Sequence, residues 1–180
     1  MNSYEDDDEF LSIIRDLITN DKVKQMMRYR HHCDVSTYKH CINVSYISYL
    51  MCKKLRLDYV SVARAGMLHD LFLYDWRDKR PFKGILKMHA FTHPKVALEN
   101  AEKICNLNEK EKDIIVKHMW PVTFFLMPRY AESFIVTIAD KYCALSETKE
   151  YIIKKRRIRK AYIISCLISE ALMNATVIFE

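Results

Sequence analysis

Residues 63–77 read ARAGMLHDLFLYDWR, and this stretch joins an apolar helical run to an adjacent histidine and aspartate. Small and apolar residues precede the pair His69–Asp70 at the spacing of a buried helix face. We therefore predict a helix over about Asp58 to Leu73, with the pair near its end. An aspartate in such surroundings needs a cation or strong hydrogen-bond donors, because an unpaired buried carboxylate is costly.

The rest of the 180-residue chain shows the same helical periodicity around this stretch. Apolar residues make up 50% of the chain, whereas it has only two glycines and four prolines, too few for the many tight turns of an all-β protein. We predict an all-α bundle of about seven helices that forms one domain over residues 1–180, with a core over about residues 28–147.

Seven helical segments account for most of the chain, and the first and last are expected to pack on the core. The expected segments are about Glu9–Tyr29, Tyr38–Leu55, Asp58–Leu73, Pro94–Ile104, Asn108–Trp120, Tyr130–Glu147 and Tyr151–Val177. Residues 74–92, with Pro81, Gly84 and crowded charges, are typical of a functional loop. On the second helix, one apolar side is formed by Val44, Ile47, Leu50, Met51 and Leu55.

Charge and cysteine content narrow the function classes. The net charge of +6 favours anionic ligands such as phosphates, nucleotides or nucleic acid. Six cysteines form no CxxC pair, and the opening MNSYEDDDEF is acidic where a secretory signal would be basic. These features predict reduced thiols in a cytoplasmic, bacterial-type protein.

Four histidines and two aspartates recur along the chain with helical spacing. His40, His69, His93, His118 and Asp140 follow one another at intervals of 22–29 residues, about one helix plus its connection. Successive helices can thus bring one or two ligands each to a shared centre. Imidazole and carboxylate together suit first-row divalent metals. Asp140 interrupts the apolar run FIVTIADKYCAL, where an unpaired carboxylate would again be costly.

The order His…His-Asp…His…His…Asp resembles the HD-domain superfamily of metal-dependent phosphohydrolases. The resemblance runs from about Arg28 to Glu147, and its strongest portions are TYKHCINVSYISY, ARAGMLHDLFLYDWR, HAFTHPKVALENA, IIVKHMWP and ESFIVTIADKYC. In detail these segments resemble a bacterial branch of HD-domain proteins that carries the same HDLFLYDW, THP and HMWP strings.

The resemblance implies a dinuclear metal site with His69 and Asp70 at its catalytic centre. His40, His69, Asp70 and Asp140 match the ligands of a first metal. His93 and His118 match those of a second, with Asp70 bridging the two. The metals expected are Mn, Fe, Zn, Co or Ni, and the expected substrate is a small, nucleotide-like phosphate ester. HMWP stands where enzymes that act on cyclic dinucleotides carry a paired histidine followed by a Gly-Tyr-Pro motif, so the resemblance does not imply that substrate. The acidic pair that follows the HD motif in guanosine-tetraphosphate hydrolases is also missing, which argues against that substrate.

Four further residues are candidates for binding the substrate. Arg77 in the loop and Lys141 beside Asp140 are expected to orient a phosphate, whereas His32 and Lys39 precede His40 and would face the leaving group. His31, His32 and His89 are left outside the metal ligands, because a single histidine is more often a hydrogen-bonded or surface residue.

Two other functions remain open from the sequence. A few HD-type proteins are mixed-valence di-iron oxygenases that use the same six ligands. The run KKRRIRK (154–160) would also suit nucleic acid or an anionic membrane, although a solvated helix face is favoured. The apolar stretch that follows contains Glu170 and Asn174, so a helix that closes the core or a homodimer seam is favoured over a membrane span.

Overall fold

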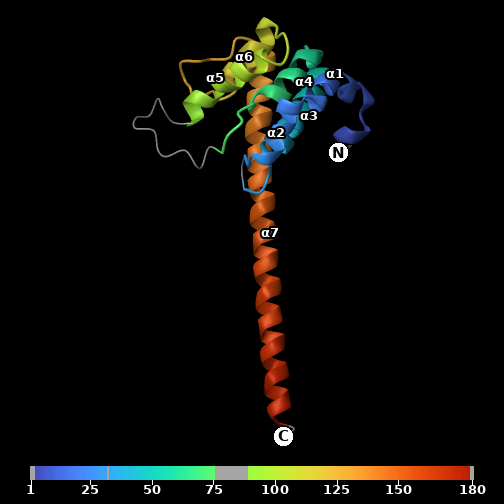
Figure 1. Ribbon diagram of the computed structural model, residues 1–180, viewed down its shortest axis with the longest axis vertical. Helices are drawn as coiled ribbons and strands as arrows, with labels where there is room; N and C mark the ends of the chain where they lie inside the picture. The colour runs from blue at the N-terminus through green and yellow to red at the C-terminus, as the bar shows by residue number, and fades with distance from the viewer. Residues whose placement is uncertain (1–2, 32, 76–88, 179–180) are drawn as a thin grey trace.

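The computed structural model describes residues 3–31, 33–75 and 89–178, with side chains as far as residue 162. This part of the chain is all-α, as predicted, with seven α-helices and no strand (Figure 1). The α-helices are α1 (Asp8–Thr19), α2 (Asp21–Gln25), α3 (Thr37–Leu55), α4 (Tyr59–Leu68), α5 (His89–Glu102), α6 (Glu109–Lys117) and α7 (Ala131–Ile178). Two 3-10 turns, η1 (Tyr4–Asp6) and η2 (Met26–Arg28), complete them.

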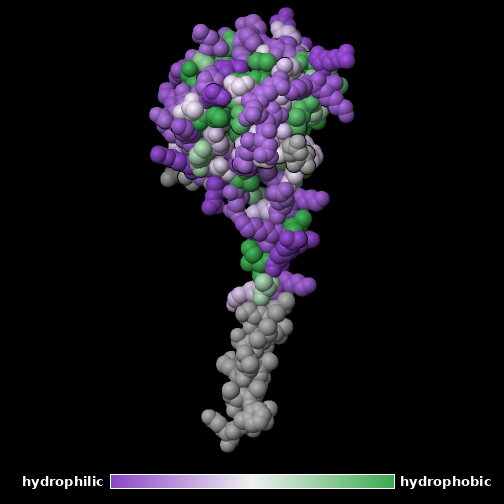
Figure 2. All heavy atoms as spheres, turned by 90° about the vertical axis from the view of Figure 1, so that its right-hand side faces the viewer, coloured by the Kyte–Doolittle hydropathy of each residue, from purple (hydrophilic) through white to green (hydrophobic). Residues whose placement is uncertain are grey.

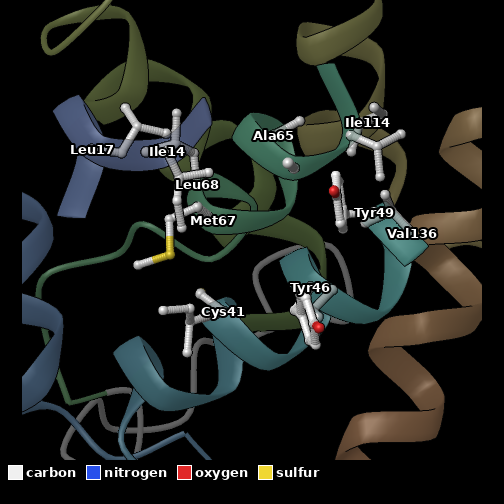
Figure 3. Close-up of a cluster of buried hydrophobic side chains, with 14 of the residues drawn as sticks. Ile14, Leu17, Cys41, Tyr46, Tyr49, Ala65, Met67, Leu68, Ile114 and Val136 are labelled. Carbon is white, nitrogen blue, oxygen red and sulfur yellow. The ribbon is translucent and has the colours of Figure 1, made fainter. Parts of the chain in front are cut away.

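Helices α3 and α4 lie at the centre of the bundle. α3 packs against α4 and α7, and α4 also contacts α1 and α6. Figure 3 shows how the core joins these elements: Leu17 of α1, Leu68 of α4, Tyr49 of α3, Ile114 of α6 and Val136 of α7 belong to one buried cluster. The cluster holds together the helices that carry the His69–Asp70 pair and its expected partners.

The N-terminal segment is not the single helix predicted over Glu9–Tyr29. α1 ends at Thr19, and Asn20 takes an extended conformation in which its side chain accepts a hydrogen bond from the Lys22 amide. Asparagine competes with helical hydrogen bonding in this way, so it caps a new helix instead of continuing the old one.

Helix α3 buries a different face from the apolar side that the sequence indicates. Val44 is buried as expected, but Leu55 is 58% exposed, and Ser45 and Ser48 are buried in place of larger apolar residues. The Ser45 hydroxyl donates a hydrogen bond to the Ala63 carbonyl at 2.6 Å, which satisfies its polar group inside the bundle. Small residues suit this face because α3 and α4 approach each other closely.

Helix α5 begins at His89, five residues before the expected start at Pro94. Pro94 is the sixth residue of this helix, so its missing N–H leaves a carbonyl of the first turn without a helical hydrogen bond. α6 agrees with the sequence, because Asn108 and Glu111 form the predicted capping box.

Helix α7 is one continuous helix, whereas the sequence predicts two helices with a break between Glu147 and Tyr151. The whole stretch contains neither glycine nor proline, and Lys149 and Glu150 at the expected break are good helix formers. Polar residues alone therefore did not end the helix.

The second half of α7 leaves the bundle and projects from it (Figure 1). Side chains 152–162 are all exposed, so this part of the last predicted helix does not pack on the core. Six of the seven residues in 154–160 are Lys or Arg, which are almost never buried unless paired, and Figure 2 shows hydrophilic side chains along the first part of the projection. Among the described residues, no helix has the length and apolarity needed to cross a bilayer.

Candidate metal centre

The six predicted metal ligands meet in the interior of the bundle. Each is at most 6% exposed, and together they come from five helices or helix ends. The residues are His40 of α3, His69 and Asp70 at the end of α4, His93 of α5, His118 at the end of α6 and Asp140 of α7. The predicted convergence of residues far apart in sequence is therefore present.

The adjacent His69 and Asp70 side chains converge because the helix ends at this point. α4 stops at Leu68, His69 is its C-cap, and the Phe72 amide turns back to the Asp70 carbonyl at 2.7 Å. On a regular helix, neighbouring side chains would diverge by about 100°. Here His69 Nε2 lies 3.6 Å from Asp70 Oδ2, so both side chains serve one centre.

Backbone carbonyls fix the orientation of three of these histidines. The Nδ1 atoms donate at 2.8 Å to carbonyls one turn earlier, His69 to Gly66, His93 to His89 and His118 to Ile115. An imidazole whose Nδ1 carries the proton presents an Nε2 lone pair, the form that binds metals. All three Nε2 atoms face the carboxylates of the centre.

His40 is oriented by a carboxylate that the sequence analysis did not identify. Its Nδ1 lies 3.0 Å from Glu147 Oε2, and its Nε2 lies 3.0 Å from Asp140 Oδ1. Glu147 follows Asp140 by two helical turns, which places both carboxylates on one face of α7 but does not by itself mark Glu147 as a partner of His40. A carboxylate behind a ligand histidine is the usual outer-shell arrangement of metal sites.

Asp70 divides the centre into two groups of ligands. Its Oδ1 lies 3.2 Å from His93 Nε2 and 3.4 Å from His118 Nε2. Its Oδ2 faces His69, which in turn lies 3.9 Å from Asp140 Oδ1. Candidate metal-binding groups accordingly include His40–His69–Asp140 and His69–Asp70–His118.

Several buried nitrogen and oxygen atoms in the centre have lone pairs that a bound cation would satisfy. His93 Nε2 and His118 Nε2 lie 2.8 Å apart, although each ring already donates from Nδ1, so two lone pairs face each other. Within the described residues, His69 Nε2 and Asp70 Oδ1 are buried without a hydrogen-bond partner. Unpaired buried acceptors are unfavourable, and a metal ion satisfies them.

The charge states also suit metal ligation. Burial lowers the pKa of His69 to about 3, so this imidazole is neutral at pH 7. Burial opposes ionisation of the two aspartates, but the facing histidines hold the pKa of both Asp70 and Asp140 well below the usual range. Neutral imidazole and anionic carboxylate are the forms that bind a divalent cation.

Metal binding at pH 7 is expected to release a proton from His40. Burial alone would lower the pKa of this imidazole, but its hydrogen bonds to Asp140 and Glu147 raise the pKa to about 10. The metal-free ring is therefore protonated, and a metal must displace the Nε2 proton. Affinity should rise with pH, by up to about tenfold per unit between pH 6 and 8.

Calorimetric titration of the metal-free chain in two buffers of different ionisation enthalpy measures this proton release. Glu147→Gln serves as the comparison, because loss of its charge lowers the pKa of His40 and so reduces the number of protons released at a given pH. A metal affinity that does not change with pH would contradict this protonation state.

The candidate substrate-binding residues have different positions. Lys141 lies at the edge of the centre, with its Nζ 2.6 Å from Asp140 Oδ2 and 3.3 Å from the His118 carbonyl. Lys39 does not join the centre, since its Nζ lies 3.3 Å from the Tyr4 hydroxyl and over the Tyr4 ring. Arg77 and His32 lie outside the described residues.

His31 is a second residue that the sequence analysis missed. It was left outside the ligand set, yet its Nε2 lies 2.7 Å from Asp70 Oδ2. A short polar segment before α3 carries it, and neither spacing nor periodicity marks it in the sequence.

Comparison with known families agrees with this centre. The model of the HD domain matches residues 37–145, from the first residue of α3 into α7. The matched stretch includes all six predicted ligands. HD domains bind divalent metals, and a match to this domain points to the superfamily of metal-dependent phosphohydrolases. Neither the curated proteins nor the solved structures give a match. With most of its length matched and the histidines and aspartates of the centre brought together, the chain belongs to the HD domain family.

Proposed function

We propose that this protein is a metal-dependent phosphohydrolase that cleaves a small, nucleotide-like phosphate ester with the help of two divalent ions. The observation that carries the proposal is the position of Asp70, whose Oδ1 faces His93 and His118 and whose Oδ2 faces His69. A carboxylate shared in this way is suited to bridge two cations, and paired cations are a common arrangement for hydrolysis of phosphate esters.

The residues divide between the two proposed metals. His40, His69 and Asp140 would hold the first, and His93 and His118 the second, with Asp70 shared. When bound, such ions acidify a water molecule and neutralise charge on a phosphate. Glu147 and the carbonyls behind the other histidines hold each Nδ1, which leaves each Nε2 directed into the centre where a metal would bind.

Lys141 is the described cation best placed to bind a substrate phosphate. Its side chain is 39% exposed and lies beside Asp140, so it joins the buried centre to solvent. An ammonium group there would pair with an anionic substrate that approaches the metals.

Aromatic side chains form one wall of the centre next to the proposed second metal. The Phe72 ring lies 5.8 Å from His93 and 4.9 Å from His89, and the Tyr74 hydroxyl lies 3.3 Å from His89 Nδ1. Phe72 is fully buried. Such a wall limits water around the ligands and strengthens electrostatic interactions with a bound substrate.

A metal and substrate panel tests the proposal. The full chain is stripped with a chelator, reloaded separately with Mn, Fe, Co, Ni or Zn, and assayed without oxygen on mononucleotides, cyclic nucleotides and aryl phosphates. We expect phosphate or nucleotide release only in metal-loaded samples. Lys141→Ala should raise KM more than it lowers kcat, because the side chain binds substrate without holding a metal.

Two outcomes would contradict this function. A chain that binds none of these metals has no such centre. Product formation that requires oxygen, with an iron signal in the half-reduced state, would indicate the oxygenase that shares this ligand set.

A further inference from the structure

His31 makes the shortest histidine–carboxylate contact among the described residues of the centre. Its Nε2 lies 2.7 Å from Asp70 Oδ2, compared with 3.0 Å for the His40–Asp140 pair and at least 3.2 Å for the other imidazoles near Asp70. A hydrogen bond to an ionised acceptor at this distance is stronger than a neutral one.

The segment before α3 holds His31 in place from both sides. A bridge pairs Arg30 with Ser36, and the His31 amide donates to the Val35 carbonyl at 2.9 Å. The imidazole stacks on His40 with ring centres 3.7 Å apart, and its side chain is only 10% exposed. His31 therefore has a fixed backbone, a fixed ring plane and a carboxylate partner.

The contact is made with Oδ2, the oxygen of Asp70 that also faces His69. A carboxylate oxygen has two lone pairs, so Oδ2 can accept a hydrogen bond from His31 and still face the His69 side. With Oδ2 held, Oδ1 points to His93 and His118. One hydrogen bond thus sets the position of both oxygens.

We propose that His31 is a positioning residue, which donates Nε2–H to Asp70 Oδ2 and holds this carboxylate between the two groups of metal ligands. The inference rests on the proposed metal centre. It adds to the six proposed ligands a further side chain that binds neither metal, from a segment outside the stretch that matches the family model.

Titration of the metal-free full chain with Co²⁺ tests this role, because cobalt reports both its affinity and, through its visible absorption, its ligands. We expect His31→Ala to weaken Co²⁺ binding about 10–100-fold, the effect common for hydrogen-bond partners of metal ligands. His31→Gln should recover a large part of the affinity, since its amide can donate to Asp70. The absorption of the bound cobalt should keep its wild-type band positions in both variants.

His89→Ala is the matched control, because it also removes an imidazole stacked on a proposed ligand. The His89 and His93 ring centres lie 4.6 Å apart, and His89 Nδ1 lies 3.3 Å from the Tyr74 hydroxyl. Its substitution should weaken Co²⁺ binding clearly less than His31→Ala does. Thermal unfolding of the metal-free variants shows whether each still folds.

The outcomes separate this inference from the proposed function. If the wild-type chain binds no cobalt, the metal centre itself is wrong. If wild type binds cobalt and His31→Ala binds it as well as His89→Ala does, only the positioning role is wrong. A changed cobalt spectrum that glutamine does not restore would make His31 a ligand, which also overturns the positioning role.

Discussion

Asp70→Asn is expected to empty the metal centre while leaving a folded chain. The asparagine keeps the shape of the side chain but removes the negative charge and replaces one of the two oxygens that face His69 and His93. Loss of an outer-shell partner commonly costs 10–100-fold in metal affinity, so loss of the shared ligand should cost more than about 100-fold. Phosphate-ester hydrolysis should fall with it.

Elemental analysis after dialysis measures the metal that each variant retains, and circular dichroism shows whether it folds. Asp113→Asn is the matched control, since Asp113 is also a buried aspartate but pairs with Lys117 and the Ser133 hydroxyl, outside the centre. This control should retain its metal. An Asp70→Asn variant with full metal content, or equal losses in both variants, would disprove the role of Asp70.

The burial of the two aspartates of the centre was predictable, because each carries its own signal in the sequence. Asp70 and Asp140 interrupt apolar runs, and a buried carboxylate requires a partner wherever the fold places it. The capping box at Asn108 was predictable for a similar reason, since it depends only on residues three positions apart. Local chemistry of this kind does not depend on the tertiary arrangement.

The outer residues of the centre were not predictable because their roles arise only from packing. Glu147 reads as an ordinary polar residue of a helix until α3 brings His40 to it. His31 lies in a polar segment without periodicity, and only the turn before α3 brings it to Asp70. Such residues are defined by contacts between elements that are far apart in the sequence.

The buried face of α3 and the continuity of α7 also differ from the prediction. Apolar periodicity marked the side of α3 that ends at Leu55, but the helix buries Ser45 and Ser48, and the close approach of Gly66 leaves room only for a small side chain at Ser45. The break expected near Lys149 rested on polarity, whereas helix continuity depends on backbone propensity.

Gly66→Ala is expected to destabilise the fold and weaken metal binding, although residue 66 touches no metal. A Cβ at this position would lie 2.8 Å from Ser45 Cα and 3.2 Å from Ser45 N, so α3 and α4 would have to separate. Overpacking of this kind costs about 1–3 kcal/mol and sometimes more, whereas alanine gains at most about 1 kcal/mol in helix propensity. We expect a net loss of about 1–2 kcal/mol in the free energy of unfolding.

The loss of metal affinity follows from the backbone at the same position. The Gly66 carbonyl accepts the hydrogen bond from His69 Nδ1 at 2.8 Å, so a shift of α4 changes the direction of His69 Nε2. Urea denaturation of the metal-free chain and a metal titration measure the two effects separately. Val60→Ala, at an exposed position of the same helix, should change the free energy of unfolding by less than about 0.5 kcal/mol.

Ser45→Gly in the Gly66→Ala background distinguishes a backbone clash from a side-chain clash. Two of the three close contacts are with Ser45 backbone atoms, so removing the serine side chain should restore little of the lost stability. Full recovery would mean that the helices are free to adjust at this crossing. In that case the requirement for glycine, and its link to the orientation of His69, would both be wrong.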